Sequence, residues 1–140
     1  MGRTLTDRAR RYLTTFEDMT GAGVSDCVVL DDRVVIVVEP GEMGAAIGPD
    51  GAHVRAVESA IDRTVKVIEG ADDPARFVAN ALAPAAVEHV VVSTQGGVTV
   101  AYVEVPAADR GVAIGAAGST IGLARTLAAR HHAIDDVQLA

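Results

Sequence analysis

Two short glycine-containing stretches in this sequence have residue types and spacing that would let a loop bind an anionic group such as phosphate. Residues 47–51 read Ile-Gly-Pro-Asp-Gly, and residues 114–118, which lie 67 positions later, read Ile-Gly-Ala-Ala-Gly. Glycine at both ends of such a loop lets the main chain approach a ligand closely, because no Cβ intrudes. Each stretch precedes a segment with helical spacing, and the N–H groups at a helix N-terminus favour phosphate. We therefore expect backbone contacts to phosphate at both loops.

The similarity between the two stretches continues on both sides of the glycines. Gly44 and Ala46 correspond to Gly111 and Ala113 at the same offset, and each copy follows an apolar run rich in β-branched residues, at 34–38 and 98–105. A chain of 140 residues would be one domain on length alone. The repeat instead predicts two modules, residues 1–70 and residues 71–140.

The hydrophobic periodicity predicts the same order of elements in both modules: a helix, two strands, two helices and a strand. The predicted ranges are a helix at 4–20, strands at 27–30 and 33–38, helices at 42–47 and 52–61 and a strand at 64–69, then a helix at 74–83, strands at 87–92 and 98–105, helices at 109–114 and from 119 to about 130, and a strand at 134–139. The first two strands of each module are close in sequence and therefore antiparallel, whereas the third follows a helical crossover. The predicted fold class is α+β, with a three-stranded mixed sheet in each module.

Local signals mark several of these boundaries. Thr4 and Asp7 have the spacing of a capping box, and Gly21 is a suitable stop for the same helix. Asp73 followed by Pro74 predicts an N-cap and the first helical position of the helix that opens the second module. Within the first glycine loop, the Asp at position 50 is a candidate cap for the helix that follows it.

The acidic composition is unusual for a protein that binds nucleic acid. The net charge is −7, from twelve Asp and seven Glu against eleven Arg and the single Lys66. Abundant Asp with almost no Lys is typical of a salt-loving cytoplasm, where the Debye length falls to about 3 Å and negative charge repels phosphate only at close range. The alternative interpretation of the same charge is a protein that does not bind nucleic acid.

Several classes of function are excluded by what the sequence lacks. The single cysteine, Cys27, excludes intrachain disulfides and Cys-rich zinc sites, and no apolar run approaches the ~20 residues of a membrane span. With no signal-peptide pattern, we expect a cytoplasmic protein. His131-His132 and Asp135-Asp136 are better explained by a helix end and a strand than by a metal site. We find no nucleotide-binding glycine motif and no catalytic set, so we expect no enzyme activity, cofactor, metal or small-molecule substrate.

The order helix-strand-strand-helix-helix-strand, with the glycine loop between the last two helices, resembles the type II, or prokaryotic, KH fold. Two such units in tandem resemble the NusA-like transcription factors of archaeal type, and the resemblance covers essentially the whole chain. The stretches that carry it are Gly41-Glu42-Met43-Gly44, Ala46-Ile47-Gly48, Gly51, Asn80-Ala81-Leu82-Ala83-Pro84-Ala85, Ala101-Tyr102-Val103-Glu104-Val105 and Ile134-Asp135-Asp136-Val137.

This resemblance implies a factor that binds single-stranded RNA and acts in transcription elongation, termination or antitermination, with RNA polymerase or other transcription proteins as further partners. A KH unit grips about four nucleotides between its loop and an apolar groove. Arg55 and Arg125 would supply the cations that related loops carry between the glycines. The implied RNA-binding residues are Ala46, Ile47, Gly48, Pro49, Asp50, Gly51, Val54 and Arg55 in the first module, and Ala113, Ile114, Gly115, Ala116, Ala117, Gly118, Ile121 and Arg125 in the second.

Two other functions stay open on the sequence alone. The acidic charge and the absence of Lys or Arg between the glycines would also suit a KH-fold scaffold for protein interactions with reduced RNA binding. Type II KH units also occur in ribosomal and RNA-maturation accessory factors. An RNA-binding measurement at high KCl distinguishes the first of these alternatives from an RNA-binding factor.

Overall fold

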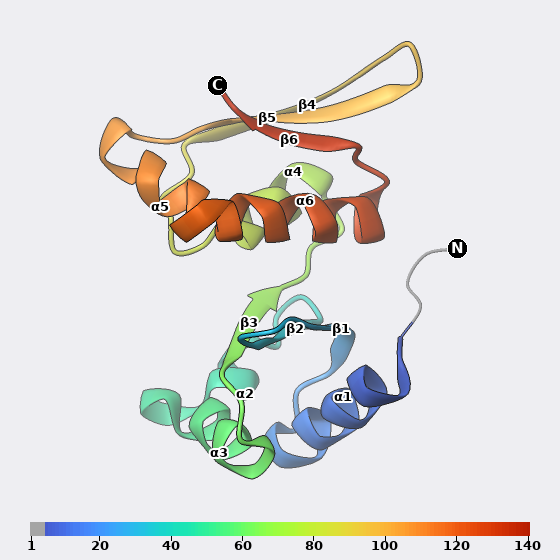
Figure 1. The fold of residues 1–140 in the computed structure, drawn as a ribbon, viewed down its shortest axis with the longest axis vertical. Coiled ribbons are helices and arrows are strands. Elements are labelled where there is room, and N and C mark those ends of the chain that lie inside the picture. Colours follow the sequence, from blue (N-terminus) through green and yellow to red (C-terminus); the bar gives the residue numbers. More distant parts are fainter. Residues whose placement is uncertain (1–4) are drawn as a thin grey trace. The chain divides into compact units, whose positions relative to one another are not determined.

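The computed structural model describes residues 5–140, and the chain divides into two compact units at the junction between Gly70 and Ala71. Each unit contains one three-stranded sheet and the helices that pack on it. Figure 1 draws the first unit in blue to green and the second in yellow-green to red.

The first unit has the element order that the sequence predicts. Its elements are α1 (Asp7–Thr20), β1 (Val24–Val29), β2 (Val34–Val38), α2 (Met43–Ile47), the 3₁₀ turn η1 (Pro49–Gly51), α3 (Ala52–Ile61) and β3 (Val65–Glu69). The strand order is β1-β2-β3, with β1 antiparallel and β3 parallel to β2. All five residues of β2 are buried, as an uninterrupted Val/Ile run in the central strand of a covered sheet requires.

The second unit repeats this arrangement. Its elements are α4 (Pro74–Ala81), β4 (His89–Gln95), β5 (Val98–Glu104), the 3₁₀ turn η2 (Ala107–Asp109), α5 (Arg110–Ile114), the 3₁₀ turn η3 (Ala116–Gly118), α6 (Ser119–His132) and β6 (Asp136–Leu139). The strand order is β4-β5-β6, again antiparallel and then parallel. The predicted mixed sheet is therefore confirmed in both units.

Each core lies between the sheet and its helices. In the first unit, Phe16 of α1, Ile36 of β2 and Val57 of α3 belong to one buried cluster. In the second unit, Ala101 and Val103 of β5 are fully buried, while Tyr102 and Glu104 next to them are exposed. Side chains alternate between the two faces of a strand, and Figure 1 shows α4 and α6 on one side of this sheet. The buried face is therefore the one that the helices cover.

The helix caps confirm some of the predicted boundaries and correct others. The Thr6 side chain, which precedes α1, accepts a hydrogen bond from the Ala9 N–H at 3.0 Å. The predicted cap at Thr4 was therefore wrong for this helix, and Thr4 itself lies outside the described residues. Gly21 ends α1 in the left-handed conformation, as predicted.

Two strands differ most in extent from those predicted. β1 begins at Val24 rather than at position 27. A register shift between Val24 and Asp26 allows pairing with β2 to continue on both sides of Asp26, whose side chain is buried. β4 spans 89–95 rather than 87–92, because its polar end pairs with β5 as far as the Gly96-Gly97 turn. Backbone pairing, and not hydrophobicity, therefore sets both limits.

No single helix among residues 5–140 is long and apolar enough to cross a lipid bilayer. By length and composition, only the consecutive helices Ala107–Ile114 and Ala116–His132 together reach the required span, and they are bent by 49° at the glycine loop.

We expect the stability of this fold to rise with salt concentration. The ion pairs Arg10–Asp7 and Arg33–Asp32 are 4.0 Å long, too weak to offset a net charge of −7. Repulsion among unscreened carboxylates disfavours the compact state. The melting temperature measured by circular dichroism should rise steadily from dilute buffer to molar KCl. A melting temperature that does not change with KCl would contradict this prediction.

A variant with fewer carboxylates provides a control. Asp18→Asn and Asp31→Asn change two exposed positions. The double variant should have a higher melting temperature than wild type in dilute buffer and the same melting temperature in molar KCl.

Candidate nucleic-acid interface

Each glycine loop lies inside the crossover that connects two parallel strands. In the first unit the loop joins α2 to α3 between β2 and β3, and in the second it joins α5 to α6 between β5 and β6. Because both ends of each crossover are fixed in the sheet, the loop is held in place by the core beneath it.

The two loops follow the same backbone path although their central residues differ. The dihedral angles match at three positions of each loop: the first glycine, the residue two positions after it, and the second glycine. No angle differs by more than 5° between the two loops. The values of φ and ψ are 75° and 173° at Gly48, 79° and 168° at Gly115, 53° and 29° at Asp50, 55° and 28° at Ala117, 76° and 15° at Gly51, and 75° and 17° at Gly118. The repeat in the sequence is therefore a repeat of loop conformation.

The first glycine of each loop cannot be replaced without strain. Gly48 and Gly115 occupy a region of positive φ and extended ψ that essentially only glycine adopts. A Cβ at Gly48 would lie 2.7 Å from the His53 ring atoms Cδ2 and Nδ1, and one at Gly115 would lie 2.7 Å from the Thr120 backbone nitrogen. Both the dihedral angles and the close neighbours therefore require glycine at these two positions.

His53 and Thr120 support the loops, although neither was predicted from the sequence. They are separated by the same 67 positions as the glycines, so the repeat itself contained the signal. His53 lies beneath Gly48, and its Nδ1–H donates to the Ala45 carbonyl at 2.7 Å. This bond ties α3 to α2 across the first loop.

The helices that follow the loops begin without side-chain caps. Gly51 and Gly118 are the N-cap residues of α3 and α6, and neither helix start has a side-chain hydrogen bond. By contrast, Asp73 accepts from the Arg76 N–H and caps α4, as predicted. The suggestion that Asp50 caps α3 was wrong, since this residue adopts a left-handed conformation in the preceding turn. The N–H groups of Ala52 and Ser119, the first residues of the two helices, donate to the Pro49 and Ala116 carbonyls. The first-turn N–H groups that follow them have no side-chain cap and are the candidate donors to an anion.

The two loops differ in the donors and charges that they present. Position 49 is proline, which has no N–H, whereas Ala116 at the corresponding position carries one. A turn with successive N–H groups and a left-handed residue forms a concavity that binds anions. Ala116 and Ala117 are both exposed. The second loop thus offers one more donor than the first and lacks the carboxylate of Asp50.

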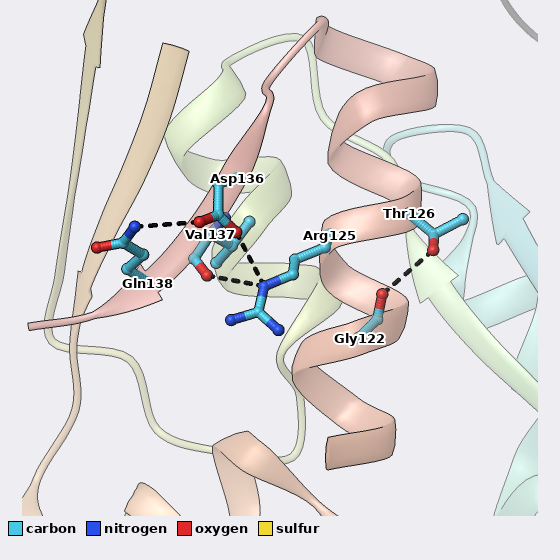
Figure 2. Close-up of polar contacts among 6 residues, drawn as sticks. All are labelled: Gly122, Arg125, Thr126, Asp136, Val137 and Gln138. Atoms are coloured by element: carbon cyan, nitrogen blue, oxygen red, sulfur yellow. Dashed lines mark hydrogen bonds and ion pairs between the residues drawn. The ribbon is translucent and has the colours of Figure 1, made fainter. Parts of the chain in front are cut away.

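Arg125, one of the two predicted cations, is used to join α6 to β6. Its Nε donates to Asp136 Oδ1 at 3.0 Å and to the Val137 carbonyl at 3.1 Å, as Figure 2 shows. Hydrogen bonds from the Gln138 side chain and the Val137 N–H, together with the nearby guanidinium, hold the pKa of Asp136 below its ordinary value. Arg125 therefore pairs with a carboxylate of its own unit.

Arg55 lies close to its loop and has no counterpart in the second unit. It is exposed, and a Cβ at Gly51 would lie 2.7 Å from its Nη1, which places the guanidinium beside the second glycine of the loop. The offset of 67 positions takes Arg55 to Gly122. The first loop therefore combines one cation with the Asp50 carboxylate, and the second loop is neutral with no equivalent cation.

The apolar residues predicted to line the groove lie at different depths. Ala46 and Ala113 are fully buried, and Ile121 is almost so. Ile47 and Val54 are half-buried, while the Ile114 side chain is 40% exposed. The buried residues support the loops from below. Ile47 and Val54 in the first unit, and Ile114 in the second, leave apolar surface that a base could contact.

The His and Asp residues near 131–136 each have a structural partner within the second unit. His131 stacks on Phe77 with ring centroids 4.9 Å apart, and His132 Nε2 lies 2.9 Å from the Ala71 carbonyl oxygen. Asp135 accepts from the Thr99 N–H at 2.7 Å. Among the described residues, no group of three His, Cys, Asp or Glu side chains could hold a metal ion.

Comparison with known proteins agrees with this geometry. A family model described as a KH domain matches residues 10–72, and one described as a NusA-like second KH domain matches residues 74–138. The probable transcription termination protein NusA of Halococcus morrhuae is 54% identical over 137 residues, which are 98% of each chain. The protein of the same name in Halobacterium salinarum is 53% identical over 135 residues, 96% of each chain.

The same arrangement occurs in a solved structure. The crystal structure of APE1850 is similar with a TM-score of 0.83 and 28% identity, over 97% of this chain and 100% of that one. The halophilic sources of the two NusA relatives agree with the acidic, Lys-poor composition. The predicted tandem type II KH fold is confirmed, and the chain belongs to the NusA-like family of KH-domain proteins.

Proposed function

We propose that this chain binds single-stranded RNA through its two glycine loops and acts as a transcription termination factor. The observation that carries the proposal is the pair of matching loops, each opening onto a helix whose N-terminus has no side-chain cap. Phosphate groups satisfy such N–H donors and interact favourably with the positive helix end. The NusA names of the relatives support the role in termination.

The contacts follow from the placement of the predicted residues. The loop backbones at 48–51 and 115–118 hold phosphates, while Ile47, Val54 and Ile114 contact bases from the accessible side. Ala46 and Ala113 act only from beneath the loops. We assign the stronger backbone grip to the second loop, because Ala116 supplies the donor that proline removes from the first.

This function places the protein in the cytoplasm, with RNA and the transcription machinery as its partners. The family consists of non-enzymatic factors, and the proposal requires no cofactor or metal. The acidic surface is compatible with RNA binding in concentrated salt, because phosphate repulsion is then screened within about 3 Å.

Gly122→Arg should strengthen RNA binding by giving the second loop the cation that Arg55 gives the first. No atom lies within 4 Å of a Cβ at Gly122, so the side chain has room. We expect roughly threefold tighter binding in dilute salt, as for an exposed charge pair, and a salt slope steeper by about 0.7. The measurement is fluorescence anisotropy with a short single-stranded RNA across a KCl series.

Gly122→Ala is the matched control for this experiment. Like Gly122→Arg, it replaces a glycine by a residue of higher helix propensity, but it adds no charge. Its RNA affinity should therefore equal that of wild type. If wild type bound no single-stranded RNA at any KCl concentration, the proposed function would be wrong.

A further inference from the structure

The outer face of the second sheet carries large apolar side chains that its own helices do not cover. Val91 is 48% exposed, Val98 is 51% exposed and Tyr102 is 41% exposed. They alternate along β4 and β5 with residues that face α4 and α6, and so they lie on the opposite side of the sheet from those helices. Apolar residues gathered on one exposed face indicate a binding surface.

Part of this face is hollowed. A cavity of ≈ 180 Å³ is lined by Ser93, Gln95, Val98, Val100 and Tyr102. The register pairs Ser93 with Val100 and Gln95 with Val98, while Tyr102 lies one step further along β5 on the same face. Cross-strand pairing therefore brings these five side chains together.

The size and lining of the hollow are those of a site for one planar ring. Pockets for drug-sized ligands have volumes of about 300–1,000 Å³, so this hollow accepts a smaller group. The Tyr102 ring provides an aromatic surface, and Val98 and Val100 are apolar. Within the described residues, the side chains of Ser93 and Gln95 make no intramolecular hydrogen bond. An amide that both donates and accepts can pair with the polar edge of a base.

We propose that this hollow binds one nucleobase of a single-stranded RNA, stacked on Tyr102. The inference rests on the proposed function and extends it to a second contact, outside the glycine loops. Tyr102 is suited to this role because Phe16 and Phe77 are fully buried, and Tyr12 lies beneath the Arg8 guanidinium.

The charge of the protein favours a base over a phosphate at this site. The hollow contains no Lys or Arg side chain, and phosphate contacts weaken steeply as salt rises. Stacking depends on the π-face of the base and tolerates any sequence. An acidic RNA-binding protein in concentrated salt therefore gains affinity by holding bases, and a neutral aromatic hollow provides that contact.

The test compares Tyr102→Ala with Tyr102→Phe, which keeps the ring. Affinities for a single-stranded RNA of about twelve nucleotides, long enough to exceed one loop site, are measured by anisotropy in molar KCl. Tyr102→Ala should bind roughly tenfold more weakly than wild type, and Tyr102→Phe should bind as wild type does. In a Tyr12→Phe background the only tyrosine is Tyr102, so RNA binding should quench its fluorescence.

The loop variants separate this inference from the proposed function. One outcome refutes the base site: Asp at Ala116 and Ala117 weakens RNA binding, but Tyr102→Ala binds normally and the tyrosine fluorescence is unchanged. The proposed function of the loops would then stand, and the apolar sheet face would be a surface for a protein partner. If wild type binds no RNA, both proposals fail. The base site is supported if Tyr102→Ala binds RNA more weakly than wild type and RNA quenches the Tyr102 fluorescence of the Tyr12→Phe protein.

Discussion

Replacing Ala116 and Ala117 together by Asp should weaken RNA binding by at least about a hundredfold. The two carboxylates would stand where the loop presents its N–H groups, and each would repel the phosphate that those groups hold. Hydrogen bonds to a charged group contribute roughly 1.5–3 kcal/mol each, so losing two of them leaves only the contacts of the first loop. The measurement is anisotropy with a short single-stranded RNA in dilute and molar KCl.

The double variant should fold normally. Both alanines are exposed, and Ala117 has φ 55°, a left-handed conformation that Asp adopts more readily than Ala. Circular dichroism and the melting temperature should therefore match those of wild type.

Ala129→Asp with Ala133→Asp is the matched control. Both residues are exposed, and Ala133 has φ 52°, close to that of Ala117. They add the same charge near the other end of α6, about 20 Å away by helix length. The control should bind RNA almost as wild type does. Equal binding by the loop variant and wild type would show that the second loop does not hold RNA.

Gly115→Ala should destabilise the second unit by roughly 2–6 kcal/mol, a large effect for a single methyl group. The dihedral angles at this residue cost a non-glycine about 1–3 kcal/mol. The overlap with Thr120 adds a further cost on the order of 1–3 kcal/mol, since backbone must move to relieve it. Unfolding in urea, followed by circular dichroism, gives the change in the free energy of unfolding.

Two other glycines in the same unit provide graded controls for that measurement. Gly118 has φ 75° but open space around its Cβ position, so Gly118→Ala should cost only about 1–2 kcal/mol. Gly122 lies in a helix with open space, and Gly122→Ala should stabilise by about 0.5–1 kcal/mol. A Gly115→Ala protein as stable as the Gly118→Ala protein would contradict the loop geometry.

The sequence predicted the fold well because the signals were duplicated. The uninterrupted apolar run at 34–38 predicted a central strand, and Asp73-Pro74 predicted a helix start; the structure confirms both. The repeat of the glycine stretches at a fixed offset predicted tandem units of the same fold, which neither stretch would have indicated alone.

The parts that sequence reasoning missed depend on contacts between elements. Helical position suggested that Arg55 and Arg125 have similar roles, but the offset of the repeat pairs Arg55 with Gly122, and Asp136 on β6 holds Arg125. Asp50 was expected to cap α3, because a left-handed Asp and a capping Asp have the same sequence signature. Only the backbone angles distinguish them.

The position of each loop within a crossover also determines the order in which the protein can fold. The β4–β5 hairpin closes through a two-residue turn, whereas β6 reaches β5 only after two helices have been spanned. Closing a long connection costs more entropy than closing a short one, so we expect the hairpin to form early and β6 to dock late. We therefore expect a nascent chain to position its second glycine loop only after residues 136–139 have left the ribosome.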